Sequence, residues 1–441
     1  MSGTSLRIFI VAGEPSGDAL GAALINGLRR RIGGNLWIAG VGGERMQEAG
    51  VASLAPLDDL AVLGVAEVLP RAARILRRVR ETVAAVRRLR PDAVVTIDSS
   101  GFSWRIAQRL RRRGETLPLI HYVAPMVWAW RGSRARRMAR WYDHLMTLLP
   151  FEPPYFERVG LPCSWVGHPV VECGADRGDA ERFRSRHGLA ADELLITVLP
   201  GSRSGEVERL LPVFGAAIAR LAEAVGPMRV AVPTVASVAP AIGAAVQNWP
   251  GRPIVIRRPD EKYDAFAASR AALAASGSVA LELAMARLPM AVAYRLNPLT
   301  EALLDRVLKV RHVNLVNLIL GEPLVDELLR GHCAPDRLAA AVIRLIHDER
   351  VRAVHRAGYD EAMRRLGAGG VSPSLRAADK VLEIVGAGRA AVSHPHQSCG
   401  GMHNGNDRHR RSDQAGDRRR QISAAAYDDP GARPRPIAAL L

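Results

Sequence analysis

Residues 6–21, with the sequence LRIFIVAGEPSGDALG, place an apolar run directly before a glycine-containing loop and the start of an amphipathic stretch. Such a run is typical of a buried strand, and the Gly-Glu-Pro-Ser-Gly loop that follows it favours a turn into a helix. A strand, a short loop and a helix in this order predict an α/β fold that is built on a parallel sheet.

The same alternation of short apolar runs and amphipathic stretches continues along the chain and forms two blocks. A polar stretch over residues 174–180 separates the blocks, and the pattern over residues 336–385 is helical. The predicted fold class is therefore α/β, with two sheet-containing domains. The expected strands cover residues 7–12, 36–41, 93–97, 119–123 and 144–148 in the first block and 194–199, 229–232, 254–256, 271–274 and 290–294 in the second.

Composition limits the classes of protein to which the chain can belong. Its 441 residues are 48% hydrophobic, which is enough for two cores and excludes wholesale disorder. The 4 cysteines are too widely spaced for a disulfide framework or a zinc site. No apolar run reaches about 18 residues, so we expect no membrane-spanning helix and a cytoplasmic location.

The net charge of +17 favours partners that carry negative charge, namely nucleic acid, anionic lipid or phosphorylated substrates. Residues 393–435 are polar, mixed in charge and without an apolar period, which predicts a disordered tail. An RNA-binding arm is the alternative for this tail, although it lacks the interleaved aromatic residues of such arms.

The loop after the first strand holds Gly13, Glu14, Ser16, Gly17 and Asp18. Glycines let a backbone come close to a ligand, and the N-terminus of the following helix offers free N–H groups to an oxyanion. The glycine spacing differs from the dinucleotide-binding fingerprint, which argues against hydride transfer. The pattern alone leaves a packing turn and a ligand-binding loop as equal alternatives.

Polar and aromatic residues follow two further strands of the first block. Asp98 comes directly after an apolar strand, at the edge of a parallel sheet where ligands bind, and suits either a general base or a helix N-cap. His121, Trp128, Trp130 and Arg131 lie within or after the next strand. The tryptophans suit either the core or a face that stacks on a sugar, and the pattern favours the core.

Two loops of the second block place small residues between a strand and a helix, and the first also carries an arginine whose guanidinium suits a diphosphate. Two such loops in one domain predict a nucleotide diphosphate held at helix N-termini. No Asp-x-Asp pair or Walker lysine accompanies them, so nothing in the pattern requires a metal. The residues are Gly201, Ser202 and Arg203 in the first loop and Ser276, Gly277, Ser278 and, one turn later, Glu282 in the second.

Residues 63–89 are the candidate for contact with a membrane. Apolar side chains recur at helical spacing and arginines surround them, as in helices that lie on an anionic bilayer. On the pattern alone, a surface helix that packs its apolar stripe on the sheet is the favoured alternative. The expected membrane-contact residues are Val68, Leu69, Arg74, Ile75, Leu76 and Arg78.

Taken together, these strings resemble the lipid-A-disaccharide synthase family over roughly residues 6–386. The strings HYV at 121–123 and VWAWR at 127–131 are specific to this family, whereas those of the second block are shared more widely among sugar transferases. The other matches are AGEPSGD at 12–18, GVGG at 40–43, RM at 45–46, ID at 97–98, LPFE at 149–152, VGHP at 166–169, LPGSR at 199–203, SGS at 276–278, LE at 281–282, PM at 289–290 and NL at 317–318.

The resemblance implies a GT-B fold, in which two Rossmann-like domains face each other across a cleft and the last helices return to the first domain. It implies an acceptor- and membrane-facing domain over residues 1–173, a UDP-sugar donor domain over 174–365 and a returning helix over 366–387, followed by the basic tail over 388–441. The family transfers a sugar from UDP-2,3-diacylglucosamine to 2,3-diacylglucosamine 1-phosphate, forms a β-1,6-linked disaccharide and releases UDP.

The resemblance also implies partners and site residues. The family works without a metal or other cofactor at the cytoplasmic face of the inner membrane. We therefore expect the two lipid substrates and an anionic membrane surface as partners and no nucleic acid, and a homodimer stays open. Asp98 is implied as the catalytic base, and Arg203 is implied as a contact of the donor phosphates. The acceptor-side residues are Gly13, Glu14, Ser16, Gly17, Asp18, His121, Trp128, Trp130 and Arg131, and the donor-side residues are Gly201, Ser202, Arg203, Ser276, Gly277, Ser278, Glu282 and Asn317.

Two alternatives stand beside this interpretation, and the chain departs from the family pattern after Asp98, at residues 124–126 and at Asn314 and Val316. Another UDP-N-acetylglucosamine enzyme, such as the peptidoglycan transferase or a 2-epimerase, would share the donor loops but not the string at 127–131. A basic nucleic-acid-binding protein would show salt-sensitive affinity that is independent of UDP. Where the family commonly has Ala-Pro-Asp-Phe-Asn after its aspartate, this chain has SSGFS at 99–103, so Asp98 is the only carboxylate of the motif.

Overall fold

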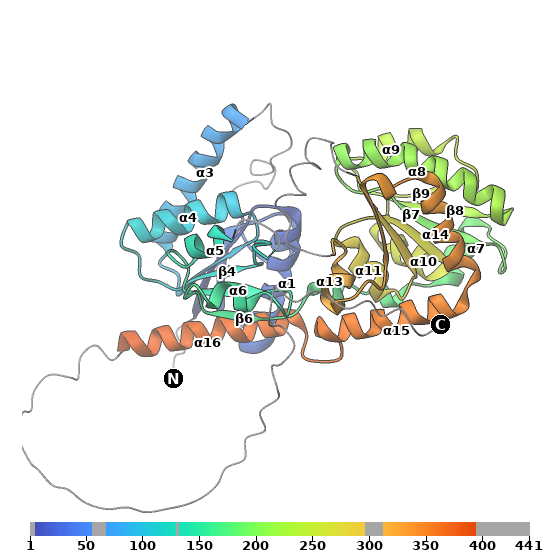
Figure 1. Ribbon diagram of the computed structural model, residues 1–441. Coiled ribbons are helices and arrows are strands. Elements are labelled where there is room, and N and C mark those ends of the chain that lie inside the picture. Colours follow the sequence, from blue (N-terminus) through green and yellow to red (C-terminus); the bar gives the residue numbers. More distant parts are fainter. Residues whose placement is uncertain (1–4, 55–67, 129–131, 296–311, 394–441) are drawn as a thin grey trace, which may run out of the picture. The chain divides into compact units, whose positions relative to one another are not determined.

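The computed structural model describes residues 5–54, 68–128, 132–295 and 312–393 (Figure 1), and for 68–72, 100, 330 and 388–393 it describes the backbone alone. These residues contain two six-stranded sheets, and every pair of neighbouring strands is parallel. All ten expected strands are present, with ends that differ from the prediction by one residue at most. Each sheet has one additional short strand at its edge that the sequence pattern did not predict.

The first half of the chain builds the sheet with strand order β2-β1-β3-β4-β5-β6. Because β2 and β3 lie on opposite sides of β1, the strand order reverses between β1 and β3. In chain order the elements are β1 Leu6–Ala12, α1 Pro15–Ile32, β2 Leu36–Val41, α2 Glu44–Glu48, α3 Val68–Leu89, β3 Ala93–Ile97, α4 Ser100–Arg112, β4 Leu119–Tyr122, α5 Ser133–Met138, β5 His144–Thr147, α6 Pro153–Glu157, β6 Cys163–Trp165 and the 3₁₀ turns Pro169–Glu172 and Ala175–Arg177.

The side chains of β1 divide between two cores, because successive residues of a strand point to opposite faces. Leu6, Ile8 and Ile10 pack with α1 and with α16 (Pro373–Ser393) on one face, and Phe9 and Val11 pack with α3, α4 and α5 on the other. Helices therefore cover both faces of this sheet, as is usual for parallel sheets. All residues of the central strands β3 and β4 are buried, whereas the edge strand β6 and the first half of β2 are only half-buried.

The second half builds the sheet with strand order β12-β11-β10-β7-β8-β9, which reverses between β7 and β10. Helices α8, α9 and α14 cover one face of this sheet, and α11, α13 and α15 pack on the other. The elements are α7 Ala180–His187, β7 Leu195–Leu199, α8 Ser204–Val225, β8 Arg229–Pro233, α9 Ala239–Val246, β9 Ile254–Ile256, α10 Pro259–Ala268, β10 Ala271–Ala275, α11 Val279–Met285, β11 Met290–Tyr294, α13 Leu315–Leu320, β12 Asp326–Leu329, the 3₁₀ turn Arg330–His332, α14 Pro335–His347 and α15 Glu349–Arg365.

The last helix of the described chain is α16 (Pro373–Ser393), which follows α15 in sequence but packs against α1 of the first sheet (Figure 1). Ala377, Ala378 and Val381 are fully buried in the core that β1 and α1 share. Among the residues that the structure describes, no helix has the length and apolar character needed to cross a bilayer.

Candidate active site

The strand order places the first group of candidate residues side by side. In open parallel sheets, ligands bind beyond the carboxyl ends of the strands at the point where the strand order reverses. That point lies between β1 and β3, and Ala12 is the register partner of Ile97 at their ends. The loop that begins at Gly13 and the segment that begins at Asp98 therefore start next to each other.

The Asp98 carboxylate faces the loop after β1. Ser16 Oγ donates a hydrogen bond to Asp98 Oδ2 at 3.4 Å, and the side chain of Asp98 is half-buried. Ser99 rather than Asp98 is the N-cap residue of α4, and its side chain makes no capping hydrogen bond. The alternative that Asp98 caps the helix is therefore wrong, and its carboxylate is available for chemistry.

The backbone at the ends of β3 and β4 adopts a conformation that costs free energy. The φ angles are 50° at Asp98, 42° at Ser99 and 82° at Val123, all in the left-handed region that residues with a Cβ atom avoid. Each such residue costs about 1–3 kcal/mol and persists only when its surroundings enforce it, which occurs most often at functional sites. These three residues mark the ends of two adjacent strands as a functional candidate.

Glu14 places a second carboxylate beside Asp98. Its side chain and that of Ser16 are exposed, whereas Gly13 and Gly17 on either side are buried. The surrounding protein raises the pKa of Glu14, the charge of Asp98 raises it further, and the Arg203 guanidinium lowers it. The loop thus combines both alternatives that its sequence left open, because its glycines pack and its polar side chains remain accessible.

Asp18 is a correction to the predicted acceptor-side residues. Its carboxylate is buried and accepts hydrogen bonds from the backbone N–H groups of Gly43 at 2.7 Å, Arg45 at 3.0 Å and Met46 at 3.1 Å. These N–H groups belong to the first turn of α2 and have no partners inside that helix. Asp18 therefore fixes α2 to α1, and both oxygens of its buried carboxylate are engaged by the backbone.

His121 is a second correction, because it lies inside β4 and is completely buried. Its Nδ1 lies 2.8 Å from Thr96 Oγ1, which also hydrogen-bonds the Tyr142 hydroxyl at 3.1 Å. Burial lowers the pKa of His121 to about 3, so the ring is neutral. A neutral, inaccessible imidazole between two strands supports the core and does not contact an acceptor.

Trp128 belongs to the core and does not form a sugar-stacking face. The side chain is 7% exposed, packs edge-on against Phe151 with ring centroids 5.4 Å apart, and donates from Nε1 to Glu152 Oε1 at 3.3 Å. Burial raises the pKa of Glu152 to about 7. Trp130 and Arg131 lie outside the described residues.

The second group of candidates lies at the switch point of the other sheet, between β7 and β10. Gly201 has φ of 112°, which favours glycine, and the side chain of Glu206 lies where a Cβ atom of residue 201 would be. The Ser202 N–H donates to the same carboxylate oxygen at 3.3 Å. This tight turn leaves the Ser202 and Arg203 side chains exposed at the start of α8.

The loop after β10 exposes Gly277 and Ser278 and half-buries Ser276 directly before α11. Glu282, one turn into that helix, forms an ion pair with Lys262 of α10 at 2.5 Å. The predicted loop residues thus lie at one end of the sheet, with the Glu282 carboxylate already paired to a cation.

Asn317 is a third correction, because its amide is buried and its hydrogen-bonding groups are taken. Nδ2 donates to Val325 O and to Glu327 Oε1, both at 2.8 Å, and Oδ1 accepts from Val325 N at 2.8 Å. The side chain therefore joins α13 to the segment that leads into β12. In this arrangement Asn317 is fully buried and its amide holds two segments of the fold together.

The structure adds Tyr294 and Arg209 to the donor-side candidates. Tyr294 ends β11, the neighbour of β10; burial and the charge of Glu206 raise its pKa, whereas Arg203 and Arg209 lower it. Tyr294 is therefore within electrostatic reach of residues of the first donor-side loop and of α8. Its position directly at a strand end is the signal that sequence reasoning could have used.

The apolar stripe of α3 belongs mostly to the core. Val79, Val83 and Val86 are at most 1% exposed and pack under the helix, and Ile75 is half-buried against the same core. Leu76 is 36% exposed. Most of the apolar stripe of α3 therefore packs on the sheet, as the alternative prediction had it, and Ile75 does so with part of its side chain.

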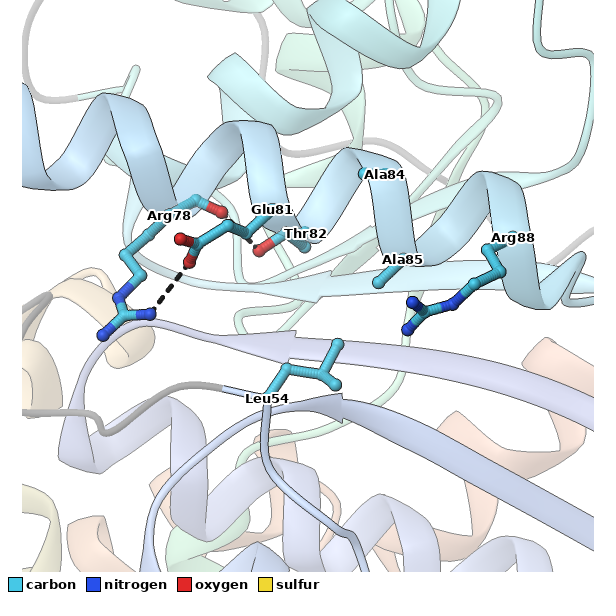
Figure 2. Close-up of a pocket in the computed structure, with 7 residues that line it drawn as sticks. All are labelled: Leu54, Arg78, Glu81, Thr82, Ala84, Ala85 and Arg88. Atoms are coloured by element: carbon cyan, nitrogen blue, oxygen red, sulfur yellow. Dashed lines mark hydrogen bonds and ion pairs between the residues drawn. The ribbon is translucent and has the colours of Figure 1, made fainter.

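The remaining predicted membrane-contact residues divide in the same way. Arg74 is exposed, whereas Arg78 donates from Nη1 to Glu81 Oε2 at 2.8 Å. The side chains of Val68 and Leu69 lie outside the described residues. A cavity of about 420 Å³ opens beside this part of α3 (Figure 2), and its lining consists of Leu54, Arg78, Glu81, Thr82, Ala84, Ala85 and Arg88.

No group of three or more His, Cys, Asp or Glu side chains within the described ranges is placed to hold a metal ion. Beyond the strand ends of the first sheet lie the carboxylates of Glu14 and Asp98, and beyond those of the second sheet lie Arg203 and the small residues of the loop at 276–278. The first set suits a general base, and the second suits the binding of an anionic ligand.

A model of the lipid-A-disaccharide synthetase family matches residues 8–371. The lipid-A-disaccharide synthase of Rhodospirillum centenum is 56% identical over 380 residues, which cover 86% of this chain and 95% of that protein. This chain belongs to the lipid-A-disaccharide synthetase family. The synthase of Paramagnetospirillum magneticum is 50% identical over 386 residues, which cover 87% of this chain and 99% of that protein.

Solved structures show how far the fold of this lipid-A-disaccharide synthetase family member is shared. UDP-GlcNAc 2-epimerase from Neisseria meningitidis, bound to UDP-GlcNAc, has a TM-score of 0.60 at 11% identity and covers 87% of this chain and 100% of its own. The calicheamicin glycosyltransferase CalG4 has a TM-score of 0.53 at 17% identity, with 86% and 98% covered. Both likenesses concern the fold, which is GT-B, and the family match disfavours the epimerase and peptidoglycan-transferase alternatives.

Proposed function

We propose that this chain joins the sugar of UDP-2,3-diacylglucosamine to 2,3-diacylglucosamine 1-phosphate and releases UDP and the β-1,6-linked disaccharide 1-phosphate. Membership of the lipid-A-disaccharide synthetase family supports a UDP-sugar as the class of donor. The observation that carries the proposal at the level of residues is the Asp98 carboxylate, which follows β3 at the switch point and accepts from Ser16.

Asp98 acts as the general base in this proposal. An acceptor hydroxyl attacks the anomeric carbon of the donor sugar from the side opposite UDP, and Asp98 takes the hydroxyl proton as the new C–O bond forms. The bond between the anomeric carbon and the UDP oxygen breaks with its electron pair on UDP. Attack from the opposite side inverts the anomeric centre.

Arg203 and the loop at 276–278 stabilise the departing UDP in the same proposal. Negative charge grows on the β-phosphate as the bond breaks, and fixed donors aimed at such charge lower the barrier. Arg203 supplies an exposed guanidinium, and the loop supplies backbone and hydroxyl groups without side-chain bulk at Gly277. Because these groups compensate the charge, we propose that the reaction needs no metal.

Association with an anionic membrane surface is the third part of the proposal. Both substrates carry acyl chains that are too apolar to be free in water. Leu76 and Arg74 are both exposed on α3, and a helix that exposes apolar and cationic side chains suits an interfacial position on anionic lipid.

The decisive experiment combines product analysis with one substitution. Wild-type protein given both acylated substrates should form the disaccharide 1-phosphate and UDP, identified by mass spectrometry. The Asp98→Asn protein should lose turnover by about 100-fold or more, the range for a lost general base, while UDP affinity measured by calorimetry stays near wild type. A folded Asp98→Asn protein with wild-type turnover would remove Asp98 from this role.

A further inference from the structure

Ser103 is a fully buried hydroxyl that touches the backbone of Asp98. It lies in the first turns of α4, has 0% exposure, and donates from Oγ to the carbonyl oxygen of Asp98 at 2.8 Å. The predicted site did not include it, although it is the last residue of the SSGFS string at 99–103.

The hydrogen bond from Ser103 replaces one that the helix does not make. The Phe102 N–H, four residues after Asp98, donates to Ser99 O at 2.9 Å instead, and the Ser103 N–H donates to Ser99 O at 3.0 Å. The helix therefore begins its own hydrogen bonds at Ser99. The Asp98 carbonyl precedes the first carbonyl that accepts within the helix, and it accepts the hydrogen bond of the Ser103 hydroxyl instead.

The other backbone group of Asp98 is fixed from the opposite side. Its N–H donates to Tyr122 O in β4 at 2.9 Å, so the two peptide groups of Asp98 are held by two different elements. Between these two hydrogen bonds the residue has φ of 50°, a conformation that reverts readily unless the surroundings enforce it.

We infer that Ser103 is a positioning residue that keeps the Asp98 carboxylate at the strand end by holding the Asp98 carbonyl in its left-handed conformation. The inference rests on the proposed role of Asp98 as the base. Without the hydroxyl, the carbonyl has no partner from the helix, and the peptide is free to rotate toward an ordinary conformation. The carboxylate then leaves its place beside Ser16.

The test removes the hydroxyl with the smallest change of volume. Ser103→Ala should lower kcat by about 10- to 100-fold, the range for a reacting group displaced by about 1 Å, and should leave KM for both substrates and UDP affinity little changed. Ser269→Ala is the control for loss of a serine hydroxyl away from the site, because Ser269 Oγ donates to the carbonyl of Ala265 at 2.8 Å and also hydrogen-bonds Thr197 Oγ1 at 2.8 Å. It should lower the melting temperature and leave kcat at the wild-type value.

A second pair of variants separates the hydroxyl from side-chain size. Threonine and valine have nearly the same shape, and only threonine keeps the hydroxyl. Ser103→Thr should therefore retain clearly more kcat than Ser103→Val, at similar melting temperatures. Equal loss in both variants, or wild-type kcat in Ser103→Ala, would overturn the inference.

A double substitution distinguishes this inference from the proposed function. If Ser103 acts through Asp98, then adding Ser103→Ala to Asp98→Asn should not lower kcat further. A further loss of the same size would show that Ser103 acts elsewhere and would overturn the inference. Full activity of Asp98→Asn would instead overturn the proposed base, whereas an inactive Asp98→Asn with a normal Ser103→Ala overturns the positioning role alone.

Discussion

A Cβ atom on Gly13 would lie 2.5 Å from Oγ of Ser99, so the loop after β1 and the end of β3 fit together only because residue 13 is a glycine. Real Cβ atoms do not approach this closely, and Ser99 already has a left-handed backbone with φ of 42°. The two segments that carry Glu14 and Asp98 are therefore coupled through a contact that involves neither carboxylate.

We expect Gly13→Ala to reduce turnover by about 10-fold or more, because the added methyl group displaces Ser99 and with it Asp98. Steady-state kinetics with both substrates measures the effect. Gly243→Ala in α9 is the control, since a Cβ atom there meets nothing within 4 Å and alanine favours a helix. If both alanine variants keep wild-type turnover, the contact does not position the aspartate.

Arg203→Ala should weaken UDP binding by about 1.5–3 kcal/mol, the value of a hydrogen bond to a charged group. This corresponds to a roughly 10- to 150-fold increase in Kd, which titration calorimetry measures directly. Arg220→Ala on the same helix removes an arginine that is paired with Asp336 and should leave Kd unchanged. Unchanged UDP affinity in Arg203→Ala would show that Arg203 serves only the start of α8.

A chelator should not affect the reaction. The described residues hold no cluster of potential metal ligands, and Arg203 together with the loop at 276–278 is proposed to carry the charge of UDP. Activity after dialysis against EDTA is therefore expected to equal that of untreated protein. Loss of activity that Mg²⁺ or Mn²⁺ restores would contradict metal independence.

The sequence predicted the fold well because strands in a doubly covered parallel sheet are continuous apolar runs. The two missed strands break that rule. β6 has only three residues, Cys163–Trp165, and β12 (Asp326–Leu329) begins with two acidic residues that its position at the sheet edge tolerates. Such short edge strands are defined by the strand with which they pair, here β5 and β11, and the apolar pattern of their own residues does not reveal that pairing.

The predicted site residues differ in accessibility according to their place relative to the strand ends. Asp98, Ser16 and Arg203 come after strands and have accessible side chains. His121 lies inside a strand and Asn317 inside a helix, and both are fully buried. Matching a motif identifies residues that a family keeps, but it does not separate those that touch a ligand from those that hold the fold.

Glu152 should make the stability of the protein depend on pH. Burial raises its pKa from the ordinary 4.5 to about 7, so the folded state keeps this proton when the unfolded chain has lost it. The contribution of Glu152 to the free energy of unfolding therefore falls as the pH rises from about 4.5 to about 7. The loss is complete above that range and amounts to at most about 3 kcal/mol.

Glu152→Gln cannot titrate, so its free energy of unfolding should fall less than that of the wild type between pH 5 and pH 8. Urea denaturation at the two pH values measures the difference. The readout is the change of the free energy of unfolding with pH, not its value at one pH. Glutamine lowers that value by itself, because its NH₂ group then faces one of the two N–H donors, Trp128 Nε1 or Leu149 N, that the carboxylate accepts from. Glu157→Gln, at the other end of the helix that Glu152 precedes, controls for the loss of one exposed carboxylate. An equal change of the free energy of unfolding with pH in wild type and Glu152→Gln would contradict the raised pKa.

Two neighbouring residues of α3 separate membrane contact from packing. Leu76 is 36% exposed, whereas Val79, one turn later, is completely buried. Exposed apolar area gains about 25 cal/mol per Å² when it enters a bilayer, and buried area gains nothing because it is already out of water. Leu76→Ser should therefore reduce sedimentation with anionic liposomes and leave the melting temperature near wild type.

Val79→Ser should do the opposite: it should destabilise the fold by about 2 kcal/mol or more, because it leaves a cavity and a buried hydroxyl, while the protein that remains folded binds liposomes normally. Arg74→Glu should weaken liposome binding mainly at low salt, since the Debye length falls from about 30 Å at 0.01 M to about 10 Å at 0.1 M. If Leu76→Ser lowers the melting temperature and leaves the bound fraction unchanged, α3 is a packing helix along its whole described length and the membrane contact lies elsewhere.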